Sequence, residues 1–238
     1  LTFGKLLNGG QLCLSPDYVV VPNELEEQLI ARVVHEAQSM YPNITENEDY
    51  AGVINERHFA RLQNYIDDAV AKGAKLTIVG ANKTRASMNN RRMPLHILQN
   101  VNEDMLVMHE EIFGPILPVM TYSDVAEVPD MIEPRRNPLA MYYFGKDKSE
   151  QEYLLSHVQS GGVCINDITL HYVQEDLPFG GVGASGMGAY HGPEGFRSLS
   201  HARAIYSQTM IDVLPIIGAR PPFGEKFRKN ISKILGPI

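Results

Sequence analysis

Apolar residues recur along the chain with two periods, one typical of amphipathic helices and one typical of short strands. A helical stripe covers residues 25–37, and Asn23 stands where an N-cap is expected, with Glu26 three residues on as in a capping box. A second stripe covers residues 56–72, and Gly73 is placed to end that helix. The chain therefore predicts two amphipathic helices in its first third.

Short runs of β-branched and other apolar residues predict six strands. The runs span residues 14–21, 76–79, 95–98, 116–122, 139–144 and 163–166, and the run at 76–79 is expected to be buried. A helix over 148–159 separates the last two strands, while Pro129 and Pro134 shorten or break the helix expected between 122 and 139. This alternation predicts an α/β fold with a mostly parallel, doubly wound sheet, helices on both faces and a C-terminal tail.

Residues 178–195 are different in character, with seven glycines among eighteen residues. Gly181, Gly183 and Gly186 match the G-x-G-x-x-G dinucleotide fingerprint, which requires a strand before it and a helix after it. Pro178 precedes these glycines and no regular helix can start promptly after them. The segment is therefore interpreted as an active-site or packing loop.

One more strand is predicted over residues 202–208, before the Pro221-Pro222 linker and a basic tail. The apolar residues of the tail recur at four-residue spacing, at Phe223, Phe227, Ile231 and Leu235. Such a pattern predicts a basic amphipathic helix, which we expect to dock on protein. The chain is accordingly divided into an α/β domain, residues 1–201, and a strand with its tail, residues 202–238.

Composition restricts the classes of function. The 238 residues include 21 Lys and Arg against 28 Asp and Glu, so the net charge is −7, and no nucleic-acid partner is expected. No apolar run approaches the roughly 18 residues of a membrane-spanning helix. Two cysteines are too few for a disulfide framework, which favours a reducing, cytoplasmic location.

The first candidate for chemistry is Cys13, at the end of the sequence Asn8-Gly9-Gly10-Gln11-Leu12-Cys13. Backbone N–H groups of a tight glycine loop can stabilise a thiolate and an oxyanion. Taken alone, Cys13 is better explained as a structural cysteine at the start of a strand. Cys164 lies in a strand pattern and is expected to be a buried core residue.

The second candidate is the sequence Glu110-Glu111-Ile112-Phe113-Gly114-Pro115. A carboxylate there can accept hydrogen bonds from sugar hydroxyls, and an aromatic ring can pack on a flat ligand. Without further context, a solvated acidic pair followed by a core phenylalanine is the favoured explanation. The histidines are scattered, only His171 and His191 flank the glycine-rich loop, and no metal site is predicted.

Together the three motifs resemble those of the NAD(P)-dependent aldehyde dehydrogenases, in the same order and with the same wide separation. The Cys13 motif resembles the nucleophile loop of that family, the Glu111 motif its nicotinamide-side cofactor motif, and Pro178-Phe179-Gly180-Gly181 its late active-site loop. Residues 177–192 are most similar to the class-three branch and, within it, to the coniferyl aldehyde dehydrogenases. The resemblance covers nearly the whole chain and weakens after about Met210.

The resemblance implies roles for individual residues. Cys13 would attack the aldehyde and form a thiohemiacetal and then a thioester. Glu111 and Phe113 would hold NAD or NADP. Phe179, with Tyr190 and His191, would line the substrate pocket. The partners implied are a small-molecule aldehyde and a second copy of the chain in a homodimer.

The resemblance also implies that the dinucleotide-binding domain, the general-base glutamate and the oxyanion asparagine lie upstream of Leu1, so the isolated chain is expected to be inactive. Two alternatives stay open. One is a CoA-acylating or acyl-phosphate-reducing relative, and the other is a non-catalytic dimerisation module.

Overall fold

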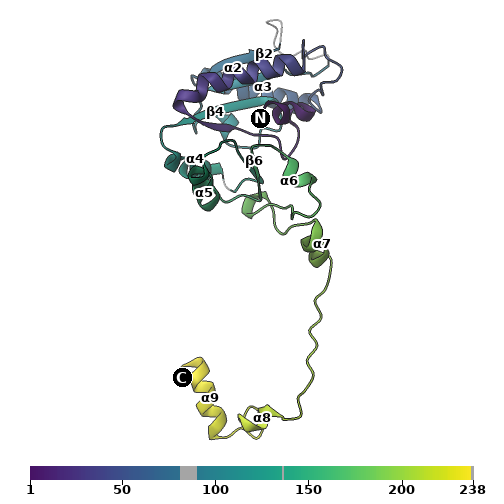
Figure 1. The fold of residues 1–238 in the computed structure, drawn as a ribbon, viewed down its shortest axis with the longest axis vertical. Helices are drawn as coiled ribbons and strands as arrows, with labels where there is room; N and C mark the ends of the chain where they lie inside the picture. Colours follow the sequence, from purple (N-terminus) through teal and green to yellow (C-terminus); the bar gives the residue numbers. More distant parts are fainter. Residues whose placement is uncertain (81–89, 136, 237–238) are drawn as a thin grey trace. The chain divides into compact units, whose positions relative to one another are not determined.

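The computed structural model describes residues 1–80, 90–135 and 137–236, and it divides into two units, Leu1–Leu199 and Ser200–Ile238. The first unit contains a four-stranded sheet and a two-stranded sheet (Figure 1). The larger has the order β1 (Val19–Pro22), β4 (Ile116–Tyr122), β3 (Leu95–Gln99), β2 (Lys75–Val79), and the smaller pairs β5 (Ala140–Tyr143) with β6 (Gly162–Ile165). All pairings except β2–β3 are parallel. The predicted α/β fold with a mostly parallel sheet is confirmed.

Helices α2 (Glu26–Met40) and α3 (Glu56–Ala71) cover opposite faces of the larger sheet. Ile97 of β3 packs in one core with Val33 of α2, whereas Leu98, the next residue, packs in the other core with Leu62 of α3. Adjacent strand residues point to opposite faces, so β3 is buried along its whole length. Gly73 ends α3 with a φ of 99°, as predicted.

Two local predictions are wrong. The run at 76–79 is not a buried strand, because β2 lies at the edge of the sheet and only Val79 is buried within it. Asn23 does not cap α2 and forms no capping box with Glu26. Its side chain donates instead to Ser123 Oγ at 2.7 Å, which ties the start of the helix to the end of β4.

The two-stranded sheet packs against α5 (Lys148–His157), whose N-cap Asp147 accepts hydrogen bonds from Ser149 and Glu150. As its prolines predicted, the segment before β5 forms only a short helix, α4 (Val128–Ile132), between 3-10 turns. The remaining helices of this unit are α1 (Thr2–Leu6), α6 (Leu170–Val173) and α7 (Gly192–Ser198).

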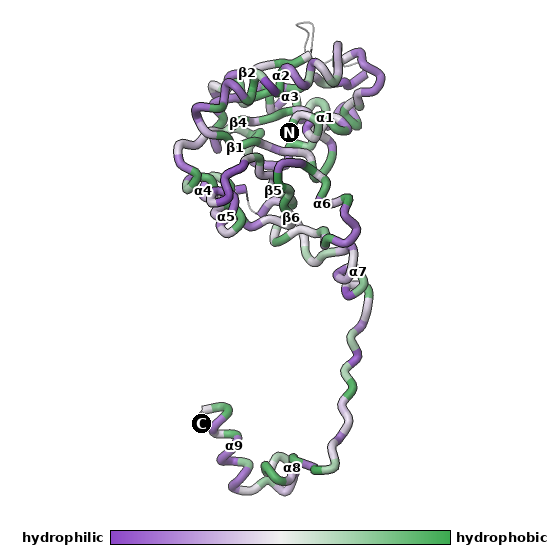
Figure 2. Tube along the Cα trace, viewed as in Figure 1, coloured by the Kyte–Doolittle hydropathy of each residue, from purple (hydrophilic) through white to green (hydrophobic). Residues whose placement is uncertain are grey.

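The second unit holds α8 (Val213–Ile216) and α9 (Glu225–Leu235). The tail helix forms as predicted, with hydrophobic and hydrophilic residues alternating along it (Figure 2). The predicted strand at 202–208 is wrong for this structure, because these residues are exposed and carry no regular secondary structure. A strand needs a neighbour for its backbone hydrogen bonds, and the described residues supply none to this segment.

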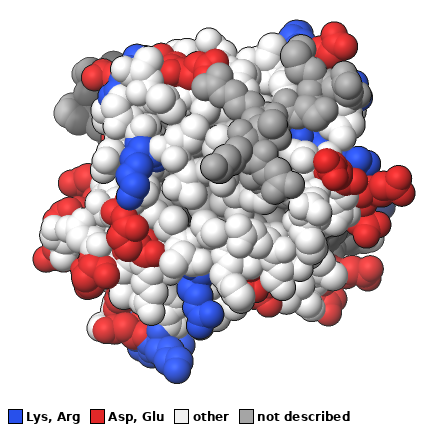
Figure 3. Space-filling model, turned by 90° about the horizontal axis from the view of Figure 1, so that it is seen from above, with Lys and Arg blue, Asp and Glu red and all other residues white. Residues whose placement is uncertain are grey.

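Charged side chains of both signs lie around the rim of the face in Figure 3, with uncharged side chains towards its centre. Across the described ranges, no helix combines the length and apolarity needed to cross a membrane.

Candidate active site

Cys13 is exposed and follows a tight turn that connects α1 to β1. Asn8, Gly9 and Gly10 all have φ between 50° and 75°, which places three consecutive residues in the left-handed region. Asn8 Nδ2 donates to the Gln11 carbonyl at 3.1 Å and closes the turn. The chain therefore leaves α1 sharply and presents the thiol at the surface of the first unit.

The buried side chain of Gln11 anchors this turn to a distant segment. Its Nε2 donates to the carbonyl oxygens of Asn8 at 3.0 Å and Gly52 at 3.1 Å, and its Oε1 accepts from the Ile54 amide at 2.9 Å. All its polar atoms are thus bonded to backbone. In the sequence, Gln11 was only one residue of the Cys13 motif, and nothing in the pattern indicated its hydrogen-bond partners.

The Cys13 loop and the Glu111 motif meet backbone to backbone. A Cβ placed on Gly10 would lie 2.5 Å from the carbonyl oxygen of Gly114, and Gly10 has a φ of 75°. Only glycine allows this approach. Two motifs far apart in the sequence are therefore held in direct contact.

Side chains on both sides hold the backbone at Glu111. Arg61 of α3 donates to the carbonyl oxygens of Glu111 at 3.2 Å and Ile112 at 2.6 Å, and Asp17 Oδ1 accepts from the Ile112 amide at 3.0 Å. The side chains of Glu111 and Phe113 remain exposed, and Phe113 has a φ of 50°. Sequence reasoning missed both Asp17 and Arg61.

Charges near Glu111 are coupled. Burial lowers the pKa of Lys5 to about 8, against the opposing effect of Asp17 and Glu111. Loss of hydration raises the pKa of Glu111, and Asp17 adds to the rise, while Arg61 and Lys5 oppose it. Among the described residues, the buried Lys5 Nζ has no hydrogen-bond partner. Lys5 therefore interacts with the carboxyl groups of Asp17 and Glu111 through its charge and not through a hydrogen bond.

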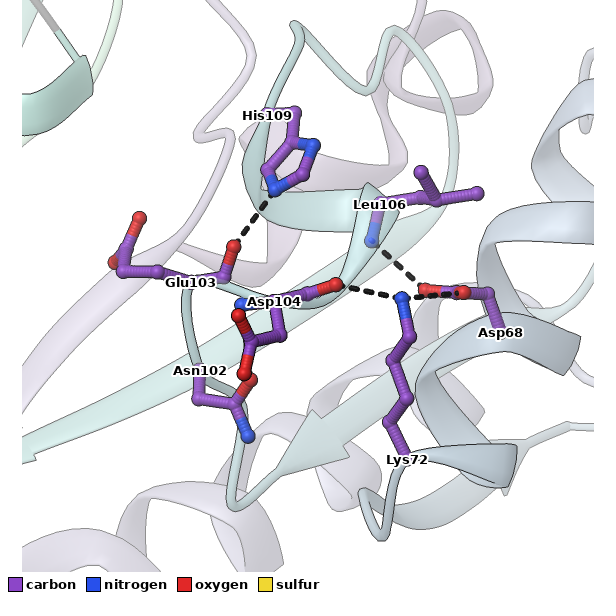
Figure 4. Close-up of polar contacts among 7 residues, drawn as sticks. All are labelled: Asp68, Lys72, Asn102, Glu103, Asp104, Leu106 and His109. Carbon is purple, nitrogen blue, oxygen red and sulfur yellow. Dashed lines mark hydrogen bonds and ion pairs between the residues drawn. The ribbon is translucent and has the colours of Figure 1, made fainter.

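The chain just before Glu111 is attached to the end of α3 (Figure 4). Lys72 Nζ contacts Asp68 at 2.7 Å and donates to the Asp104 carbonyl at 2.6 Å, and Asp68 accepts from the Leu106 amide at 2.8 Å. His109 Nε2 lies 2.7 Å from the Glu103 carbonyl. These contacts hold the segment before the Glu111 motif against the C-terminal end of α3.

In the glycine-rich loop, Phe179 and Tyr190 exchange backbone hydrogen bonds of 2.8 and 2.9 Å. The centroids of their two rings and of the His191 ring lie within 6.3 Å of one another. The G-x-G-x-x-G residues hold only a 3-10 turn, Gly183–Ser185, without the strand and helix of a dinucleotide site. The interpretation of the segment as a loop is confirmed.

A cavity of about 1110 Å³ in the first unit is lined by residues of β1, β5 and both motifs, including Cys13, Glu111 and Tyr142. The cavity lining does not include Phe179, Tyr190 or His191. The ring of His171 lies between this aromatic cluster and the cavity, because it contacts both Phe179 and Tyr142, which lines the cavity. The pKa of Tyr190 is raised by loss of hydration and then by Tyr172 and Cys13, so Tyr190 lies within electrostatic range of the thiol.

Cys164 is half-buried, and the prediction that it is a buried core residue is wrong. It lies on β6, in a two-stranded sheet that is too small to enclose both of its faces. Within the described part of the chain, no group of three or more His, Cys, Asp or Glu residues is arranged to hold a metal ion.

Comparison with known proteins gives the family. The model of the aldehyde dehydrogenase family matches residues 1–205. A probable coniferyl aldehyde dehydrogenase of Caulobacter vibrioides is 44% identical over 96% of this chain and 47% of its own length. The coniferyl aldehyde dehydrogenase of a Pseudomonas species is 40% identical over 97% of this chain and 48% of its own length.

Solved structures agree. The substrate-bound Staphylococcus aureus AldH superimposes with a TM-score of 0.80 and 32% identity, over 98% of this chain and 49% of that one. The chain belongs to the aldehyde dehydrogenase family, as the three motifs indicated. It spans about half the length of the curated relatives that it matches.

Proposed function

We propose that this chain is the nucleophile-bearing half of an NAD(P)-dependent aldehyde dehydrogenase that oxidises an aldehyde to its carboxylic acid. The observation that carries the proposal is the meeting of the two motifs. Gly10 and Gly114 pack backbone to backbone, and Cys13 and Glu111 line one cavity. Residues 1–201 form the catalytic unit, and residues 202–238 provide a tail for oligomerisation.

Cys13 is the nucleophile. As a thiolate it attacks the aldehyde carbon, and the carbonyl oxygen becomes the oxyanion of a thiohemiacetal. The backbone N–H of Cys13 supplies one donor to that oxyanion. A second donor and the base that activates water for thioester hydrolysis come from an amino-terminal half of the enzyme.

The residues at the second motif fit a dinucleotide. Glu111 offers an exposed carboxylate that accepts hydrogen bonds from ribose hydroxyls, and Phe113, 40% exposed, offers an open ring face. When bound, NAD or NADP supplies the hydride acceptor that oxidises the thiohemiacetal. Asp17 and Arg61 hold the backbone from which the Glu111 side chain projects.

Phe179, Tyr190 and His191 lie outside the lining of the Cys13 cavity and form an adjoining aromatic cluster for the organic part of the aldehyde. Tyr190, 48% exposed, offers a ring on which a flat, aromatic substrate can pack. The names of the curated relatives also point to coniferyl-like aldehydes. Steady-state kinetics of the full-length enzyme on cinnamyl, benzyl and straight-chain aldehydes test this, with the highest kcat/KM expected for the cinnamyl compound.

The proposed enzyme is a cytoplasmic homodimer in which α9 docks on protein. The tail leaves Phe223, Ile234 and Leu235 exposed, and a nucleophilic thiol must stay reduced. Deleting residues 222–238 from the full-length enzyme is expected to lower its thermal stability or shift it towards monomer in analytical ultracentrifugation. Unchanged mass and stability would reject the docking.

The isolated chain is expected to fold without turning over. Calorimetry with NAD and NADP should detect no tight binding, because a single motif does not enclose a dinucleotide. An aldehyde-dependent rise in reduced-nicotinamide absorbance from the pure chain would refute this part of the proposal.

A further inference from the structure

Tyr142 of β5 connects the nucleophile loop to the turn before α6. Its hydroxyl donates to the carbonyl oxygen of Leu14 at 2.8 Å, and Leu14 follows Cys13 directly. The backbone N–H of Thr169 approaches the same hydroxyl oxygen. One phenol therefore contacts the backbone next to the nucleophile and the backbone of a turn beyond β6.

We infer that Tyr142 is a positioning residue for Cys13, which fixes the backbone after the nucleophile and braces it against the turn at Thr169. The inference rests on the proposed role of Cys13 as the nucleophile. It adds a residue that none of the three motifs contains.

The turn at Thr169 needs such a brace. Thr169 has a φ of 57°, a left-handed conformation that a β-branched residue adopts only when its surroundings impose it. Leu14, Cys13 and Tyr142 all line the same cavity, so the brace stands at the edge of the proposed reaction space.

The hydroxyl keeps its proton in the physiological range. Burial raises the pKa of Tyr142 to about 12, with Cys164 and Cys13 adding to the rise after the opposing Thr169 N–H. Tyr142 therefore remains a donor to Leu14 throughout the physiological pH range.

Tyr143, the next residue of β5, is a matched control. Its hydroxyl donates to Glu150 Oε2 at 2.8 Å and lies 3.1 Å from the Asp147 carbonyl oxygen, on the side of the strand that faces α5. Tyr142→Phe and Tyr143→Phe each remove one bonded hydroxyl from the same strand, but only the first touches the Cys13 loop.

The test combines hydrogen exchange with thiol alkylation on the 238-residue chain. In Tyr142→Phe, amide exchange should accelerate in peptides spanning 12–16 and 167–173. Alkylation of Cys13 by iodoacetamide should slow by roughly threefold to tenfold relative to Cys164, since a loosened loop no longer orients its backbone donors. Tyr143→Phe should leave both readouts at wild-type values and accelerate exchange at the start of α5 instead.

Unchanged exchange and alkylation in Tyr142→Phe would overturn the inference, and so would equal changes in the two variants. If Tyr142→Phe unfolds the whole chain, Thr169→Gly decides. It frees the turn against which Tyr142 braces the Cys13 loop, so alkylation of Cys13 should slow relative to Cys164, and a wild-type rate overturns the inference.

The test of Tyr142 can fail independently of the test of the proposed function. If Cys13→Ser abolishes turnover of the full-length enzyme while Tyr142→Phe matches Tyr143→Phe, the proposed function stands and the role of Tyr142 fails. If Cys13→Ser retains turnover, the proposed function itself fails.

Discussion

The side chain of Gln11 accepts a hydrogen bond from the backbone N–H of Ile54 at 2.9 Å, across forty-three positions of sequence. Together with its bond to the Gly52 carbonyl at 3.1 Å, this contact attaches the Cys13 loop to the chain that leads into α3. The same helix carries Arg61, which holds the backbone of Glu111. The positions of Cys13 and Glu111 thus depend on one common support.

Replacing Gln11 should destabilise the first unit. Gln11→Ala leaves the Gly52 carbonyl and the Ile54 amide without their partner, which costs about 2 kcal/mol of unfolding free energy. Gln63→Ala, which removes a single exposed bond to Asp67, should cost less than about 0.5 kcal/mol. Urea denaturation measures both values, and equal losses in the two variants would contradict the anchoring role.

Adding a methyl group to Gly10 should be far more damaging than adding one to Gly73. Both have positive φ, but the space beside Gly73 is open, whereas a Cβ on Gly10 meets the Gly114 carbonyl. Gly73→Ala should cost about 1 kcal/mol, and Gly10→Ala about 3 kcal/mol or more. Thermal unfolding of both variants checks the difference, and similar midpoints would mean that the two motifs are not packed in solution.

The two cysteines should differ in reactivity. Cys13 is exposed at the end of its loop and Cys164 is half-buried on β6, so iodoacetamide should label Cys13 first. Peptide mapping after brief treatment of the native chain gives the order, and mapping in urea shows how far it depends on the fold. Label that appears first on Cys164 would remove the assignment of Cys13 as the nucleophile.

His171 should make stability depend on pH. Burial lowers its pKa below the ordinary value, and within the described residues neither ring nitrogen has a hydrogen-bond partner. Protonation therefore favours the unfolded chain. The contribution of His171 is unchanged above about pH 6.5 and is lost as pH falls from there towards its folded-state pKa.

His171→Gln should accordingly reduce the loss of unfolding free energy between pH 7 and pH 5. The control His35→Gln alters an exposed histidine of α2 and should follow the wild-type profile. Denaturation curves at several pH values provide the comparison. Parallel profiles for His171→Gln and wild type would show that the imidazole is hydrated in solution.

Helix positions were readable from the sequence because they depend on local periodicity and local stop signals. The stripe over residues 56–72 and Gly73 predicted α3 to within one residue at its end. The burial of strands was harder to predict. The strand β2 stands at the end of the strand order and pairs only with β3 among the described strands, and no local pattern specifies that position. Asn23 likewise donates to Ser123, directly after β4, and does not cap α2.

The candidate site shows the same division. The roles of Cys13, Glu111 and Phe179 came from the resemblance of their three motifs to those of one family, because the Cys13 and Glu111 motifs alone favoured structural explanations. Asp17 and Tyr142 were not found, because each acts through a hydrogen bond to the backbone of another segment. From the sequence alone, a polar residue that makes such a hydrogen bond cannot be distinguished from one that does not, because the backbone group that it bonds belongs to a distant segment.

The most direct test of the central claim is aldehyde-dependent NAD(P)H formation by the full-length enzyme carrying Cys13→Ser, beside the matched variant Cys164→Ser. Loss of turnover in the first and near wild-type turnover in the second is the predicted result. Undiminished turnover in Cys13→Ser, or its loss only in Cys164→Ser, would contradict the assignment of this chain as the half that carries the nucleophile.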